Sequence, residues 1–148
     1  MFSGLSVRPV KAGDLDAIMR IERASFGSDA YDRKLFADFT HICGGLFLVA
    51  SKGDKVIGYS ITCIRGDRAE LVSIAVAPQQ RRRGAAGALM DSTLRRLRRR
   101  GVTRFVLMVK VTNERALGFY EKYGFRKNRR VSRYYEDGSD GFLFVKVL

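Results

Sequence analysis

The chain has 148 residues, 46% of them hydrophobic, which is enough to bury the core of one domain without disulfides or structural metal. Its formal net charge is +13, and from residue 75 onward 18 basic residues face 6 acidic ones, a local excess of +12. Such a field attracts polyanions, but charge alone does not choose among nucleic acid, a ribosomal surface, an acidic peptide and a phosphorylated cofactor.

The cysteine and histidine content argues against metal chemistry. Cys43 and Cys63 have no CxxC spacing, and His41 is the only histidine. The chain therefore lacks the ligands for a zinc site and the residue pairing for a Cys/His nucleophile. We expect reduced thiols in a cytoplasmic protein. No run of about 18 apolar residues and no basic, apolar leader occurs, so we expect a soluble chain without membrane association.

No linker, repeat or low-complexity stretch interrupts the periodic segments, so residues 1–148 are expected to form a single domain. Apolar residues at helical spacing mark helices, β-rich runs around Lys52-Gly53-Asp54-Lys55 mark a hairpin, and Asn113 is a plausible N-cap. In chain order we expect a strand at 6–10, helices at 14–26 and 31–39, strands at 46–51, 56–65 and 69–76, a helix at 84–100, a strand at 104–111, a helix at 113–123, and strands at 125–132 and 142–148.

A glycine-rich loop at 81–87 lies between the strand at 69–76 and the helix that follows. The first amides of a helix have no partner within the helix, and its dipole adds positive charge there. Gly84 and Gly87 leave room for a phosphate to approach these amides. The loop therefore suits a diphosphate, although on its own it fits a helix start on a solvated basic turn equally well.

The loop also carries a family resemblance. Its sequence Gln80-Arg81-Arg82-Arg83-Gly84-Ala85-Ala86-Gly87 matches the signature Arg/Gln-x-x-Gly-x-Gly/Ala of the GNAT acetyltransferase superfamily. Segments 69–78 and 113–125 resemble the strand and helix that flank this signature, and segments 7–9, 21–26 and 134–140 resemble the RimI-type protein N-terminal acetyltransferases. The resemblance implies an α/β fold with a mixed, mostly antiparallel sheet of about seven strands and four main helices, splayed between the fourth and fifth strands.

The resemblance further implies direct transfer of an acetyl group from acetyl-CoA to an amine, without an acyl-enzyme. Tyr120 would stand near the thioester sulfur, where a phenol of pKa about 10 can protonate a departing thiolate whose own pKa is about 8.5. A core tyrosine is the competing interpretation. The cofactor-binding residues implied by the resemblance are Ile74, Ala75, Val76, Arg81, Arg82, Arg83, Gly84, Ala85, Ala86, Gly87, Asn113 and Tyr120.

The general base is where the chain departs from the family pattern. RimI-like enzymes usually carry a glutamate in a Leu-Glu-Val-Arg run, but here the run reads Leu107-Met108-Val109-Lys110, and methionine accepts no proton. Glu70 aligns with the glutamate that histone-type members use as base. The alternatives are a water relay to Glu70, a substrate whose amine arrives neutral, or a weakly active enzyme.

The resemblance implies that the amine enters between two loops. The candidate walls of that groove are Glu22, Phe26, Tyr31, Tyr134 and Tyr135, although ordinary packing explains each of them as well. Glu136, Asp137 and Asp140 could attract an ammonium group or simply form a polar turn. We expect a protein or peptide N-terminal amine as substrate, with a ribosomal protein as one candidate, ahead of a small amine or an internal lysine.

Five arginines crowd the helix at 84–100: Arg95, Arg96, Arg98, Arg99 and Arg100. A solvated face explains them best, ahead of a nucleic-acid contact or an attractor for CoA and a ribosomal partner. No aromatic RNA-reading motif accompanies them, so direct nucleic-acid binding is not favoured. A CoA-binding protein associated with RNA or ribosomes, with little catalysis, is the rival from another class.

Overall fold

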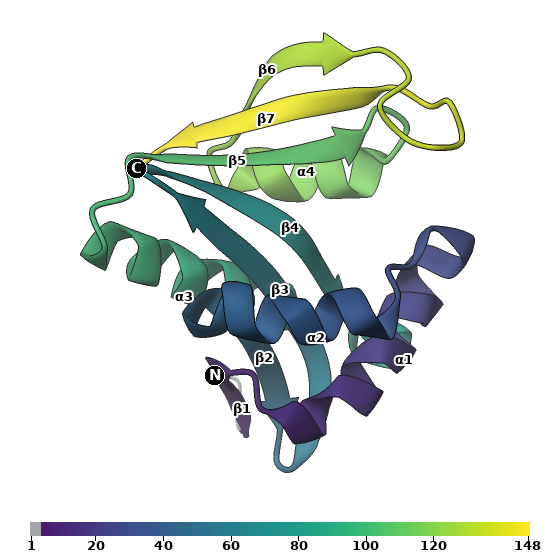
Figure 1. The fold of residues 1–148 in the computed structure, drawn as a ribbon, viewed down its shortest axis with the longest axis vertical. Helices are drawn as coiled ribbons and strands as arrows, with labels where there is room; N and C mark the ends of the chain where they lie inside the picture. Colours follow the sequence, from purple (N-terminus) through teal and green to yellow (C-terminus); the bar gives the residue numbers. More distant parts are fainter. Residues whose placement is uncertain (1–3) are drawn as a thin grey trace. The chain divides into compact units, whose positions relative to one another are not determined.

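The computed structural model describes residues 4–148 and contains the helices and strands expected from the sequence (Figure 1). The helices are α1 (Leu15–Phe26), α2 (Arg33–Ile42), α3 (Ala85–Arg99) and α4 (Glu114–Lys122). The strands are β1 (Leu5–Pro9), β2 (Phe47–Lys52), β3 (Lys55–Arg65), β4 (Arg68–Val76), β5 (Arg104–Lys110), β6 (Arg126–Val131) and β7 (Gly141–Val147).

Only α2 differs from its expected range by more than one residue at both ends. It begins later because Asp32 is the N-cap, with its side chain accepting a hydrogen bond from the Leu35 amide at 2.9 Å. It then continues to Ile42. Asn113, in contrast, caps α4 as expected, since its side-chain oxygen accepts from the Ala116 amide at 3.2 Å.

The seven strands form a sheet of order β1-β2-β3-β4-β5-β7-β6. The pairs β1–β2, β2–β3, β5–β7 and β6–β7 are antiparallel, and β4–β5 is parallel. The β4–β5 register runs only from Arg68↔Arg104 to Glu70↔Val106, and no described pair joins the two strands from Leu71 onward. The expected mixed, mostly antiparallel sheet with four main helices, open between β4 and β5, is confirmed.

By its contact pattern the chain divides into two compact units, which we describe separately. The first unit runs to Cys63 and adds Leu71–Arg100, so it contains β1, β2, most of β3 and of β4, and α1–α3. Side chains alternate across β2, so Phe47 packs with Ile18 of α1, whereas the neighbouring Leu48 packs with Leu89 of α3. Helices therefore cover both faces of this part of the sheet.

The second unit comprises Ile64–Glu70 and Gly101–Leu148, and thus the end of β3 and the start of β4 together with β5, β6, β7 and α4. Aromatic rings build its core: Phe125 lies 5.4 Å from Phe105 and 5.8 Å from Tyr120, measured between ring centroids. Phe144 on β7 is fully buried as well. This core fixes α4, which carries Tyr120, on the strands of the second unit.

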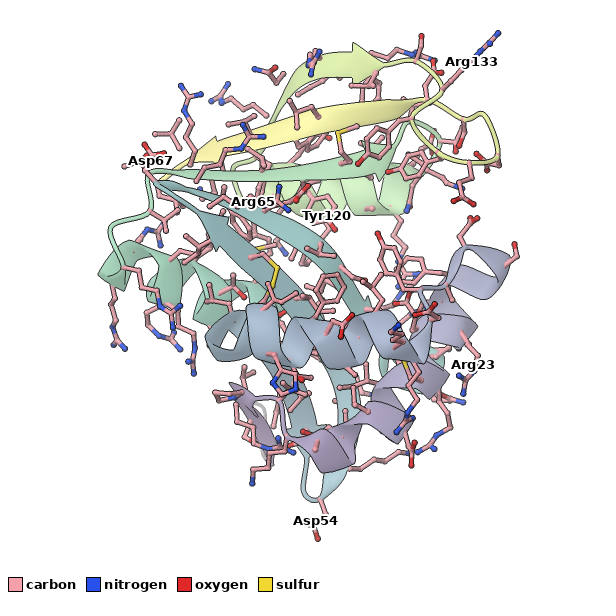
Figure 2. All side chains as sticks on the ribbon, in the orientation of Figure 1. Arg23, Asp54, Arg65, Asp67, Tyr120 and Arg133 are labelled. Carbon is pink, nitrogen blue, oxygen red and sulfur yellow. A yellow bond between two sulfur atoms is a disulfide. The ribbon has the colours of Figure 1, made fainter. Side chains whose placement is uncertain are left out.

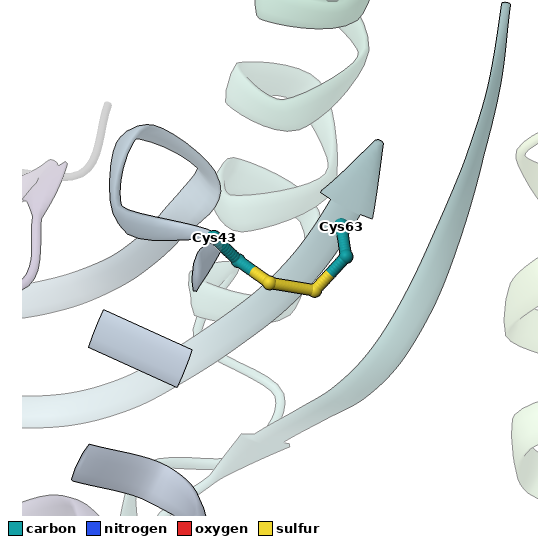
Figure 3. The surroundings of a disulfide bond; sticks show 2 residues. All are labelled: Cys43 and Cys63. Atoms are coloured by element: carbon teal, nitrogen blue, oxygen red, sulfur yellow. A yellow bond between two sulfur atoms is a disulfide. The ribbon is translucent and has the colours of Figure 1, made fainter. Parts of the chain in front are cut away.

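The two cysteines form a disulfide, so the expectation of reduced thiols is wrong (Figure 3). Cys43 caps the end of α2, and Cys63 lies on the face of β3 that packs against the same hydrophobic cluster. Their Cα atoms are 5.1 Å apart, within the usual range for a disulfide of about 4.4–6.8 Å. The separation of 20 residues matches no spacing motif, and only the packing of α2 on the sheet brings the two thiols together.

None of the helices described in residues 4–148 combines the length and the apolar character needed to cross a bilayer.

Candidate active site

The glycine-rich loop ends in a backbone geometry that suits an anion. Gly84 adopts φ 88°, in the left-handed region where a side chain is strained, and α3 begins directly after it. The Ala88 amide bonds back to the Gly84 carbonyl at 2.9 Å, so the amides of the preceding turn have no acceptor within the helix. These donors and the helix dipole form a site for a phosphate group.

The three arginines of this loop play different parts. Arg81 is half-buried, and its side chain donates to the Val76 carbonyl at 3.3 Å and to the Ser25 hydroxyl at 3.4 Å. It therefore ties the loop to the end of β4 and to α1. Arg82, with φ 65°, and Arg83 are exposed, so their charges face solvent next to the start of α3.

The strand before the loop has an edge without a strand partner. From Leu71 to Val76 no described pair joins β4 to β5, so the backbone groups on that edge are open to an extended ligand. Ala75 and Val76 are buried, and Ile74 is half-buried. The edge can therefore accept a ligand lying along it, in the manner of an added strand.

Tyr120 lies on the side of α4 that packs against Phe125, and it is 9% exposed (Figure 2). Its ring packs edge-on against Phe119 and Phe125, at centroid distances of 5.5 Å and 5.8 Å. Burial raises the pKa of the Tyr120 phenol well above its usual value of 10.0, and the nearby Tyr135 raises it further. The phenol is therefore protonated at neutral pH and can act as a proton donor.

Glu70 and Met108 share one face of the sheet. Glu70 pairs with Val106 across the parallel β4–β5 ladder, and Met108 follows Val106 by two residues. Because side chains two residues apart point to the same face, Met108 is the diagonal neighbour of Glu70. Ordinary strand spacings place their Cα atoms about 8 Å from each other. Glu70 is half-buried and has no hydrogen-bond or ion-pair partner among residues 4–148.

Met108 packs where the chain makes room for it. A Cβ atom added to Gly141 would lie 2.8 Å from Met108 Cε and 3.3 Å from the Tyr135 ring. Tyr135 in turn meets Tyr134 edge-on, with centroids 4.9 Å apart. The Met108 methyl group and the Tyr135 ring thus both approach Gly141, and methionine brings no proton acceptor to that position.

The acidic residues of the β6–β7 connection stabilise the loop itself. The pKa of Asp137 is lowered chiefly by hydrogen bonds from Ser139, and Lys110 Nζ lies 3.0 Å from its carboxylate. The pKa of Asp140 is lowered chiefly by the Arg133 amide, with Arg130 Nε 2.7 Å away. Both carboxylates are therefore engaged within the loop, which favours the polar turn over the capture of an ammonium group.

The aromatic residues of the candidate groove lie at the surface of their units. Phe26, Tyr31 and Tyr134 are exposed, and Tyr135 is half-buried. Such side chains can contact a ligand without rearrangement of the core. Tyr31 also approaches Phe36 and Phe39, which hold the start of α2 on the sheet.

Glu22 is placed differently, because it is only 1% exposed. Its carboxylate accepts hydrogen bonds from the Tyr31 amide at 2.9 Å and from the Tyr59 hydroxyl, which also lies 3.2 Å from Ser73 Oγ. Glu22 therefore fixes the connection between α1 and α2 through its hydrogen bond to the Tyr31 amide. Burial raises its pKa above the usual 4.5, although the hydrogen bonds oppose this shift.

The sequence pattern gives no sign of the polar contacts of Tyr59 and Ser73. The alternation of β3 places Tyr59 on the same face as Ile61, and both belong to the hydrophobic cluster beneath α1 and α2. That pattern predicts burial of the ring but not the partner of its hydroxyl, because Glu22 lies 37 residues earlier in the chain.

We expect Glu22→Gln to make the stability less dependent on pH. A carboxyl group whose pKa is raised by folding stabilises the protein at low pH, and this contribution is lost as pH rises through the folded-state pKa. The difference amounts to about 1.4 kcal/mol for each unit of pKa shift. Urea unfolding from pH 4.5 to 8 should therefore show wild type losing stability relative to Glu22→Gln as pH rises.

Glu22→Ala is the control for this prediction, because it removes the charge and also leaves the Tyr31 amide and the Tyr59 hydroxyl without their acceptor. Each buried, unsatisfied group costs about 1–3 kcal/mol, so this variant should be less stable than wild type at every pH. Parallel pH curves for wild type and Glu22→Gln would contradict the assignment of the titrating group.

Comparisons with known proteins agree with this geometry. Residues 15–125 match the family described as Acetyltransferase (GNAT) family. An uncharacterised N-acetyltransferase of Methanocaldococcus jannaschii is 32% identical over 142 residues, covering 95% of this chain and 90% of the relative. Among solved structures, Ard1 from Thermoplasma volcanium superposes with a TM-score of 0.94 at 26% identity, covering 98% of both chains. The ribosomal-protein-S18-alanine N-acetyltransferase of Escherichia coli gives 0.85 at 27% identity, covering 97% of this chain and 93% of that one.

Proposed function

Because the chain belongs to the acetyltransferase (GNAT) family, we propose that it transfers an acetyl group from acetyl-CoA to the N-terminal amine of a protein or peptide. The observation that carries the cofactor part is the loop at Gly84 with the free amides of α3 behind it. The substrate part is supported by the similarity to a ribosomal-protein-alanine N-acetyltransferase across 97% of the chain. A ribosomal protein is one candidate substrate.

The residues present fit acetyl-CoA. The diphosphate would be held by the backbone at 84–87, with Arg82 and Arg83 adding charge from the surface. Ile74 to Val76 would pair with the pantetheine arm along the open edge of β4, and the Asn113 amide group would reach the cofactor from the start of α4. When bound, acetyl-CoA supplies an activated acetyl thioester.

Two side chains would then carry the proton transfers. Tyr120 holds a proton on its hydroxyl at neutral pH and would release it to the departing thiolate. Glu70 would accept the proton of the attacking amine, directly or through one water, since no described residue engages its carboxylate. With both groups provided by side chains, no covalent acyl-enzyme is needed, and the disulfide-bonded cysteines have no nucleophilic role.

The substrate peptide would be held by aromatic side chains. Phe26 and Tyr31 come from the end of α1 and the segment before α2, and Tyr134 and Tyr135 come from the β6–β7 connection. Rigid aromatic rings supply a large contact area at a low entropic cost. Glu22 would act indirectly, by fixing the backbone of Tyr31.

The two compact units would act together as one catalytic domain spanning residues 1–148. The matched family region, residues 15–125, runs through both units and supports this reading. We also propose that the protein acts in the cytoplasm. The Cys43–Cys63 disulfide would then be an intracellular one, and Cys43 is shielded from solvent.

The test is release of CoA thiol from acetyl-CoA in the presence of peptides, with mass spectrometry of the product. One peptide carries a free N-terminal amine and no lysine, and its partner carries a blocked N-terminus and one internal lysine. We expect acetylation of the first peptide only. Acetylation confined to the lysine peptide, or to small amines, would overturn the proposed substrate class.

A further inference from the structure

A charged cavity lies beside the proposed base. It has a volume of about 360 Å³ and is lined by Arg65 at the end of β3 and by Arg68, Ala69 and Glu70 at the start of β4. The two strands meet at a tight turn that contains Asp67 (Figure 2). A cavity of this size lies within the usual range for small ligand sites, about 300–1,000 Å³.

The positive charge in and around this cavity is not neutralised. Arg65 and Arg68 are exposed, and neither forms an ion pair with any of residues 4–148. The nearest acidic neighbour in the turn, Asp67, is occupied by Thr103, whose hydroxyl lies 3.3 Å from the carboxylate. Among the described residues, Glu70 is thus the one carboxylate that lines the cavity.

A third arginine increases the imbalance. Arg104 on β5 is the Cα partner of Arg68, so two exposed guanidinium groups stand next to each other on neighbouring strands. Like charges directly opposite in a sheet are destabilising. An anion bound between the two guanidinium groups relieves this repulsion. Arginine is the side chain best suited to hold a carboxylate through paired hydrogen bonds.

We propose that Arg65 and Arg68 bind the side-chain carboxylate of an aspartate or glutamate within the first two residues of the substrate peptide, so that the enzyme prefers acidic N-termini. This inference rests on the proposed function, because it places the substrate amine at Glu70. The two charged groups of the peptide then meet residues of opposite charge in one cavity. Glu70 binds the ammonium form of the amine, and the arginines bind the carboxylate of the acidic side chain.

The test compares peptides that differ only by Glu or Gln at position 1, and a second pair that differs in the same way at position 2. We expect kcat/KM to be about five- to tenfold higher for the glutamate peptide in at least one pair, as for a partly exposed charge-assisted contact. The ratio should fall toward one in Arg65→Gln and Arg68→Gln, and partly recover in Arg68→Lys. It should also fall in wild type as salt is raised to about 1 M, where the Debye length is about 3 Å.

Arg95→Gln is the matched control, since it makes the same charge change at an exposed position on α3. It should keep the Glu/Gln ratio of wild type. A ratio of one in both pairs, with both peptides acetylated, overturns the inference and leaves the proposed function standing. If no peptide is acetylated, both fail. If Arg65→Gln or Arg68→Gln raises KM for acetyl-CoA without changing the ratio, the arginines bind a cofactor phosphate and the inference is overturned.

Discussion

Tyr120→Phe is expected to lower kcat by about 10²–10⁴-fold, the usual effect of losing a positioned acid. The substitution removes only the hydroxyl, so the ring contacts with Phe119 inside α4 and with Phe125 after it should persist. The affinity for CoA should therefore change little. The measurement is a thiol-release assay at saturating acetyl-CoA, combined with equilibrium binding of CoA.

Tyr123→Phe is the matched control, because Tyr123 is a half-buried tyrosine one turn from Tyr120 in the sequence. It should retain wild-type kcat within about twofold. Since burial raises the pKa of Tyr120, activity that depends on its proton should persist in wild type up to pH values above the ordinary tyrosine pKa of about 10. Equal losses in both variants, or a Tyr120→Phe enzyme as fast as wild type, would remove Tyr120 as the acid.

Glu70→Gln is expected to lower kcat/KM by about 10²–10⁴-fold at neutral pH, where most substrate amines must lose a proton before they attack. As pH approaches the pKa of the amine, the gap between the two enzymes should narrow, because the amine then arrives neutral. A pH–rate profile of both enzymes on one peptide measures this.

Met108→Glu provides the complementary test, since Met108 lies diagonally from Glu70 on the same face of the sheet. In the Glu70→Gln background, Met108→Glu should raise kcat/KM by about tenfold or more over Glu70→Gln alone, because it supplies a carboxylate from the neighbouring strand. Gly141, whose missing side chain leaves Met108 its space, should also accommodate the glutamate.

Met108→Gln in the same background has the shape of the glutamate without its charge, and it should restore nothing. Rescue by both variants would point to packing, not to proton transfer. If Glu70→Gln has no effect in the otherwise wild-type enzyme, Glu70 is not the general base. That result would favour a substrate amine that arrives neutral.

Local structure was largely readable from the sequence. The helices and strands followed from apolar spacing, from the hairpin turn at Gly53, and from the cap at Asn113, because each of these signals lies within a few residues of the element it defines. The anion-binding geometry at Gly84 belongs to the same class, since it depends on one strand, one turn and one helix that are contiguous in the chain. The family resemblance extended this local prediction to one mixed sheet of about seven strands, splayed between the fourth and fifth strands.

Tertiary structure alone decided the contacts between distant segments. The Cys43–Cys63 bond, the hydrogen bond of Tyr59 to Glu22, and the neighbouring arginines Arg68 and Arg104 join residues 20, 37 and 36 positions apart. No local propensity encodes such partners, because strand register and helix docking set them once the core has formed. The sequence by itself therefore predicts an anion-binding loop before α3, whereas the pairing of β4 with β5 decided which side chains lie beside Glu70.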